Sequence, residues 1–103
     1  MRGAGLLPPL GACLRFTNRF EDDVRALSPD RIAIVNERLA DLALALIPGS
    51  GYNPPSLGYK KLAGDPHPPS THEARGWSDG GAWRIFGHRE GDFFIVDRLA
   101  PHL

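Results

Sequence analysis

Six cationic side chains in the second half of the chain are of the types that act on phosphate esters. They are Lys60, Lys61, Arg75, Arg84, Arg98 and His102. Arginine can donate two parallel hydrogen bonds to phosphate oxygens, and histidine can give or take a proton near neutrality because its unperturbed pKa is about 6.5. Like charges gathered on one surface repel, so such a cluster indicates a bound anion. The competing interpretation is that each cation is solvated and pairs with Glu73, Glu90 or Asp97.

These cations lie on short segments separated by Gly, Pro and Asp, a pattern typical of antiparallel strands. We expect strands at Gly58–Ala63, Thr71–Trp77, Ala82–Arg89 and Phe93–Leu99, with turns at 78–81 and 90–92. Residues 64–70 are expected to form a loop, because their prolines cannot join a regular ladder. Alternation along neighbouring strands can bring Lys60 or Lys61, Arg75 and Arg84 onto one face.

A short strand at Cys13–Thr17 is expected to lead into a first helix. Asn18 followed by Glu21 has the spacing of a capping box, in which two side chains satisfy free amide groups at a helix start. This helix is expected to run to about Leu27.

The second helix has the clearest pattern in the chain. Ser28 is a good N-cap, and Pro29 suits the first helical position. Apolar residues then recur at intervals of three and four and form one stripe: Ile32, Val35, Leu39, Leu42 and Leu46. No further helix is predicted, so the stripe should cover a sheet. The predicted class is α+β, in the order β-α-α-β-β-β-β, with a helical hairpin on one face of an antiparallel sheet and the other face free for chemistry.

Length and composition indicate one small soluble domain. At 103 residues the chain suits a single domain at 13–103 preceded by a flexible extension at 1–12. Twelve basic and twelve acidic residues cancel, which argues against strong non-specific binding to nucleic acid and leaves only a local cationic cluster for such contacts. The single Cys13 cannot form an intrachain disulfide and fits a reducing cytoplasm. We find no signal peptide and no membrane span, so a cytoplasmic location is expected.

No metal or cofactor motif is evident. The four histidines, His67, His72, His88 and His102, lack paired spacing and have no cysteine or carboxylate cluster near them. No glycine-rich loop opens a helix, so nucleotide-cofactor binding is not expected. The prediction is therefore a site with no metal and no cofactor.

The ordered motifs of the second half resemble those of the RelE/ParE superfamily of toxins. The pattern consists of a lysine-rich strand ending Leu-x-Gly, a strand ending in Arg, then aromatic-Arg-aliphatic-x-aromatic, a hairpin and a final apolar strand. Here these are Lys60–Gly64, Glu73–Arg75, Trp83–Phe86, Glu90–Asp92 and Phe93–Val96. The preceding helical hairpin also fits, so the resemblance covers about residues 13–103. The pattern is most similar to mRNA interferases of the YoeB and HigB kind, in which a histidine stands near the end of the last strand.

The resemblance implies a toxin that cleaves mRNA on the ribosome, held in check by a cognate antitoxin. It implies His102 as general acid or base, Arg75 and Arg84 as ligands of the scissile phosphate, and Lys60, Lys61 and Arg98 in support. RNA carries its own nucleophile, the 2′-hydroxyl, so such an endoribonuclease requires no metal. Two alternatives stay open: a ParE-like inhibitor of DNA gyrase without nuclease activity, and a non-toxic protein-interaction module.

Overall fold

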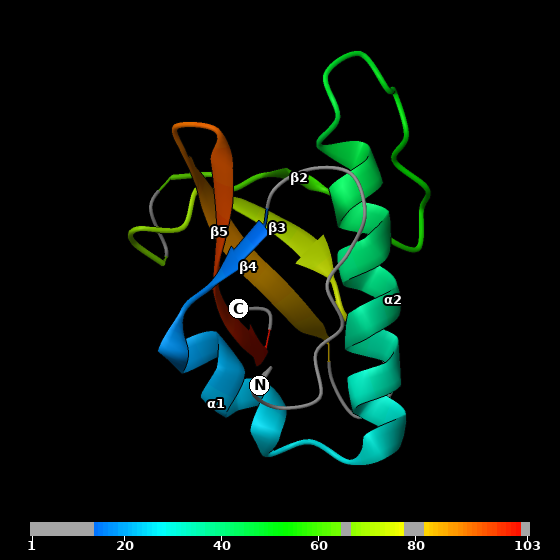
Figure 1. Ribbon diagram of the computed structural model, residues 1–103, viewed down its shortest axis with the longest axis vertical. Coiled ribbons are helices and arrows are strands. Elements are labelled where there is room, and N and C mark those ends of the chain that lie inside the picture. The colour runs from blue at the N-terminus through cyan, green and yellow to red at the C-terminus, as the bar shows by residue number, and fades with distance from the viewer. Residues whose placement is uncertain (1–13, 65–66, 78–81, 102–103) are drawn as a thin grey trace.

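The protein is described by a computed structural model over residues 14–64, 67–77 and 82–101, which form two helices and a five-stranded mixed sheet (Figure 1). The strands are β1 (Leu14–Phe16), β2 (Lys60–Lys61), β3 (His72–Arg75), β4 (Trp83–Glu90) and β5 (Phe93–Pro101). The helices are α1 (Asn18–Arg25) and α2 (Pro29–Ala45). The α+β class is as predicted. The expected extension at 1–12, the turn at 78–81 and His102 lie outside the described residues.

The sheet is mixed, and the prediction of a wholly antiparallel sheet is wrong. Its order is β1-β5-β4-β3-β2, and all neighbours are antiparallel except β1 and β5, which run parallel with Leu14 opposite Phe94. Side chains alternate with the same period in both kinds of pairing, so the sequence pattern did not distinguish them. The strand expected at Gly58–Ala63 is reduced to Lys60–Lys61, whereas β5 continues two residues beyond Leu99.

The N-cap of helix α1 lies one residue earlier in the sequence than the capping box predicted. The N-cap is Thr17, whose Oγ1 accepts a hydrogen bond from the Phe20 amide at 3.0 Å. The same hydroxyl donates to the Asp97 carbonyl at 2.7 Å, and the Thr17 amide donates to the Val96 carbonyl. These contacts tie the helix start to β5 and select Thr17 over Asn18.

Helix α2 and the core confirm the predicted apolar stripe. Ser28 caps the helix by accepting from the Arg31 amide at 3.4 Å, and Pro29 occupies the first turn. Val35, Leu39, Leu42 and Leu46 are buried, and Ile32 packs beside them. In the core they meet apolar side chains of the sheet, among them Ala74, Ile85 and Leu99. None of the helices in the described residues is long and apolar enough to cross a membrane.

The sheet's second face is defined by the residues that alternate with this core. Ala74, Ile85 and Leu99 lie opposite one another and point to the helices. Their neighbours in sequence therefore point to the other face, where Arg75 is paired with Arg84. We call this surface the cationic face. It also carries Lys60, Glu73, Phe86, Arg98 and Ala100, which follow from the same register.

Candidate anion-binding site

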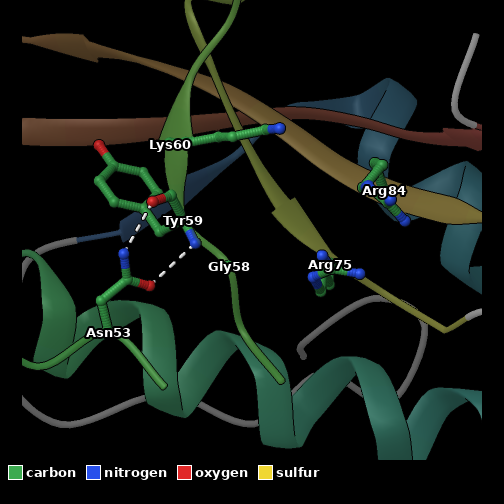
Figure 2. A pocket seen from close by; sticks show the side chains of 6 residues that line it. All are labelled: Asn53, Gly58, Tyr59, Lys60, Arg75 and Arg84. Carbon is green, nitrogen blue, oxygen red and sulfur yellow. Dashed lines mark hydrogen bonds between the residues drawn. The ribbon is translucent and has the colours of Figure 1, made fainter. Parts of the chain in front are cut away.

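An open pocket of about 260 Å³ lies where β2, β3 and β4 bring their cations together (Figure 2). It is lined by Asn53, Gly58, Tyr59, Lys60, Arg75 and Arg84. Three of these six side chains are cationic, and they come from three neighbouring strands. The residues lie up to 31 positions apart in sequence, so the folded sheet, and not a local motif, makes the pocket. We call it the anion pocket.

Arg75 and Arg84 stand directly opposite each other on β3 and β4. Two like charges at such a cross-strand pair repel, and the pairing is unfavourable unless an opposite charge lies between them. Arg84 is largely buried, with 13% of its side chain exposed, whereas Arg75 is exposed. This arrangement leaves one guanidinium firmly held and one available to a ligand.

A buried carboxylate pairs with two of the three cations. Glu73 is only 3% exposed, and its two oxygens lie 3.6 Å from Lys60 Nζ and 3.8 Å from Arg84 Nε. Arg84 also donates from Nη1 to the Trp83 carbonyl at 3.2 Å. Three positive charges against one negative charge leave the anion pocket with a positive excess of two, and Glu73 holds Lys60 and Arg84 on the same side of the sheet.

The loop before β2 supplies the remaining wall of the pocket. The Asn53 side chain accepts from the Tyr59 amide at 3.0 Å and donates to the Tyr59 carbonyl at 2.9 Å, as the dashed lines in Figure 2 show. The Leu57 carbonyl accepts from the Arg75 amide at 2.7 Å, and the Leu57 side chain is fully buried. The Leu57 carbonyl thus fastens the loop to β3, and the Asn53 side chain closes the loop on Tyr59.

Gly58 allows the Arg75 side chain to lie against this wall. Its φ is +53°, and a Cβ atom built there would stand 2.7 Å from Arg75 Nε. A side chain at position 58 would meet both backbone strain and the guanidinium. Glycine at this position thus helps to set where the exposed arginine points.

Gly58→Ala is expected to weaken anion binding by about tenfold, because the new methyl group displaces the Arg75 guanidinium. The unfolding free energy should fall by about 1 kcal/mol from the left-handed backbone alone. Gly64→Ala is the matched control: its φ is +67° and nothing lies within 4 Å of its Cβ position. Calorimetric titration with pyrophosphate measures the binding, and equal affinity in the two variants would contradict this role of Gly58.

The other predicted site residues are placed differently. Lys61 is paired with His72 and so lies on the helix-facing side of the sheet, outside the anion pocket. Arg98 is on the cationic face, where its Nη2 donates to the Pro68 carbonyl at 3.4 Å, but it does not line the pocket. His102 lies outside the described residues, and β5 can be followed to Pro101, which is paired with Trp83.

The sequence reasoning missed Glu73, Asn53 and Gly58 as parts of the site. Glu73 was read only as a partner for solvated cations, although alternation with Ala74 places it on the same face as Arg75 and Arg84. Asn53 and Gly58 carried no signal, because their roles depend on how the loop folds back on β2 and β3.

A second polar cluster joins β4, β5 and the loop before β3. One carboxylate oxygen of the buried Asp97 accepts from Ser70 Oγ at 2.7 Å and contacts His88 Nδ1 at 2.8 Å. His88 Nε2 lies 3.5 Å from Glu90. Burial alone would lower the pKa of His88, but the hydrogen bonds and charges of Asp97 and Glu90 outweigh burial and raise it. The cluster fastens the segment 67–70 over the sheet, where the His67 ring lies 4.5 Å from that of Phe86.

The His88 cluster predicts a pH-dependent contribution to stability. Because the folded-state pKa of His88 is raised, its contribution is fully present below the ordinary histidine pKa of about 6.5 and is lost as pH rises through the raised value. His88→Gln should therefore lower the unfolding free energy by about 1–2 kcal/mol more at pH 5.5 than at pH 9. Urea unfolding at the two pH values measures the difference.

His72→Gln provides a control of opposite sign. Burial first, and then the charges of Lys61 and Arg89, lower the pKa of His72, so its neutral form is favoured in the folded protein. Replacing this imidazole should therefore lower the unfolding free energy more at pH 9 than at pH 5.5. If His88→Gln lowered the unfolding free energy equally at both pH values, the proposed pH-dependent contribution of His88 would be contradicted.

Within residues 14–64, 67–77 and 82–101, no group of three histidine, cysteine, aspartate or glutamate side chains is arranged to hold a metal ion. Comparison of the chain with protein-family models, with curated proteins and with solved structures finds no match in any of the three.

Proposed function

We propose that the chain is a toxin of the RelE/ParE type that binds and cleaves RNA at the anion pocket. The observation that carries the proposal is the convergence of Lys60, Arg75 and Arg84 around one hollow, with a positive excess of two. A phosphodiester is the natural ligand of two arginine forks and an ammonium group. The two helices and the meander β2–β5 are compatible with a RelE-like arrangement, which forms part of the proposal.

The proposed reaction uses the RNA's own 2′-hydroxyl as nucleophile. The oxygen attacks the neighbouring phosphorus, the bond to the 5′-oxygen breaks, and a 2′,3′-cyclic phosphate remains. Arg75 and Arg84 stabilise the extra negative charge of the transition state, and preorganised donors of this kind contribute several kcal/mol. The 2′-hydroxyl gives up a proton and the departing 5′-oxygen takes one up. His102 is proposed to act in this transfer as general base or acid, a role that comes from the resemblance. Lys60 supports the arginines by neutralising phosphate charge.

The proposed substrate is mRNA on the ribosome, and the proposed partner is a cognate antitoxin that covers the toxin in the cytoplasm. The balanced overall charge favours cleavage on the ribosome over cleavage of free RNA, because free RNA would be attracted only by the local cationic cluster. The proposed endoribonuclease needs no cofactor, since the nucleophile belongs to the substrate.

The test is an RNA cleavage assay in a translating extract. Purified chain should produce mRNA fragments that end in a cyclic phosphate, and His102→Ala should suppress them by about a hundredfold or more. Fragments that end in a 3′-hydroxyl, or intact RNA together with normal translation, would reject the endoribonuclease. Equal cleavage by wild type and His102→Ala would reject the proton-transfer role of His102.

A ParE-like inhibitor of DNA gyrase is the second candidate. It is favoured by one observation: of the residues described around the anion pocket, none is a histidine. A pocket that binds an anionic side chain of a protein would need only the cations. Inhibition of gyrase supercoiling with RNA left intact would support this candidate, and a chain that neither inhibits gyrase nor cleaves RNA nor slows growth would indicate a non-toxic interaction module.

A further inference from the structure

A second pocket adjoins the anion pocket and shares Arg75 with it. Its volume is about 550 Å³, and it lies between α2, the loop before β2 and the end of β3. It is lined by Ile34, Arg38, Pro55, Ser56, Arg75, Gly76 and Trp77. A ligand group held by Arg75 therefore has a second, larger hollow within reach. We call this hollow the α2 pocket.

The α2 pocket differs from the anion pocket in chemistry. Ile34, Pro55 and Trp77 supply apolar walls, whereas the anion pocket is dominated by cations. The Trp77 ring is held by contacts with neighbouring side chains: it stacks on the Trp83 ring at 5.6 Å and lies 4.7 Å from the guanidinium carbon of Arg31. A ring fixed in this way gives the hollow a rigid apolar wall.

Two polar side chains add hydrogen-bonding capacity to these walls. Arg38 is oriented by a hydrogen bond from Nε to the Gly76 carbonyl at 3.2 Å and by an ion pair with Glu37. Ser56 is exposed and offers a hydroxyl that can donate or accept. A nucleobase has a flat apolar surface and polar edges, so it matches this combination.

We propose that the two pockets together bind one nucleotide unit, with the phosphate between Lys60, Arg75 and Arg84 and the base in the α2 pocket. This inference rests on the anion site proposed above and adds that the groove beside α2 selects the base. The volume of the α2 pocket lies within the range of about 300–1,000 Å³ that is typical of small-ligand sites. A phosphotyrosine also joins a ring to a phosphate, but its phenyl ring offers no acceptors for Arg38 and Ser56.

The test begins with binding to the unmodified protein. Calorimetry compares the four nucleoside monophosphates with ribose 5-phosphate, which lacks a base, and with phosphotyrosine. At least one nucleotide should bind about tenfold more tightly than ribose 5-phosphate, a difference typical of one buried base. No nucleotide preference, or tighter binding of phosphotyrosine than of every nucleotide, would overturn the proposal.

Variants then assign the preference to the α2 pocket. Ser56→Phe should fill the hollow, abolish the tenfold nucleotide preference and leave the affinity for ribose 5-phosphate unchanged. Arg75→Gln should weaken both ligands, since this residue lines both pockets. Ala40→Phe adds the same ring at an exposed position of α2 that lines neither pocket, and it should change nothing. A preference that survives Ser56→Phe would overturn the assignment.

The outcome for the base pocket is separable from that for RNA cleavage. A preference for nucleotides in binding, together with intact RNA, would reject the endoribonuclease and keep base binding in the α2 pocket. RNA cleavage without any such preference would keep the endoribonuclease and reject base binding in the α2 pocket. Oligonucleotides tested beside the mononucleotides show whether the ligand is a free nucleotide or a unit of a chain.

Discussion

Arg75→Gln is expected to reduce RNA cleavage by about a hundredfold to a thousandfold, the usual effect of removing one preorganised donor from a developing charge. Arg75 lines the anion pocket, and its side chain is exposed. The change should therefore leave the unfolding free energy within about 0.5 kcal/mol of wild type. Single-turnover cleavage and urea unfolding measure the two quantities on the same preparation.

Arg89→Gln is the matched control for this prediction. Arg89 is also an exposed arginine of the sheet, but it does not line the anion pocket. Its replacement removes the same net charge and should leave cleavage nearly unchanged. Equal losses in the two variants would mean that net charge, and not the anion pocket, governs activity.

Gly87→Ala is expected to lower the unfolding free energy by about 3 kcal/mol, at the upper end of the usual cost of overpacking. A Cβ atom at position 87 would lie 2.5 Å from the Ile95 carbonyl oxygen and would also collide with the Phe94 ring. The register of β4 and β5 shifts here: Phe86 is paired with Arg98 but Gly87 with Val96, which leaves Asp97 as an extra residue. The close approach at Gly87 is part of this irregularity.

Thermal unfolding measures the effect: the midpoint temperature Tm should fall by about 12–20 °C for a domain of this size. Gly91→Ala in the following turn is the control, since nothing lies within 4 Å of its Cβ position although its φ is +61°. That variant should lose only about 1 kcal/mol. A Gly87→Ala protein as stable as Gly91→Ala would show that β5 can move away from β4 at little cost.

The gathering of cations on one face was predictable only in outline. Alternation along expected strands placed Arg75 and Arg84 together, and the observed register pairs them directly. Whether Lys60 or Lys61 lies on the cationic face depends on the register of β2, because a shift of one residue moves every side chain of a strand to the other face. The register of Lys60 with Glu73 decides it in favour of Lys60.

The cap of α1 shows how a tertiary contact overrides a local signal. Asn18 and Glu21 have the capping-box spacing, but the Thr17 hydroxyl bonds both the Phe20 amide and the Asp97 carbonyl, 80 residues away. No pattern within residues 17–21 contains that second partner. The α2 cap, formed by Ser28 and Pro29, has no such competitor, and there the prediction is confirmed.

The sequence by itself determined the two helices, the apolar stripe of α2, the strand-rich second half and the α+β class, because each depends on short-range periodicity or on turn residues. The tertiary structure alone decided the parallel pairing of β1 with β5, the pairing of the buried Glu73 with two of the cations, and the α2 pocket beside Arg75. These features join segments that are distant in sequence, and their positions depend on register and packing, which local periodicity does not encode.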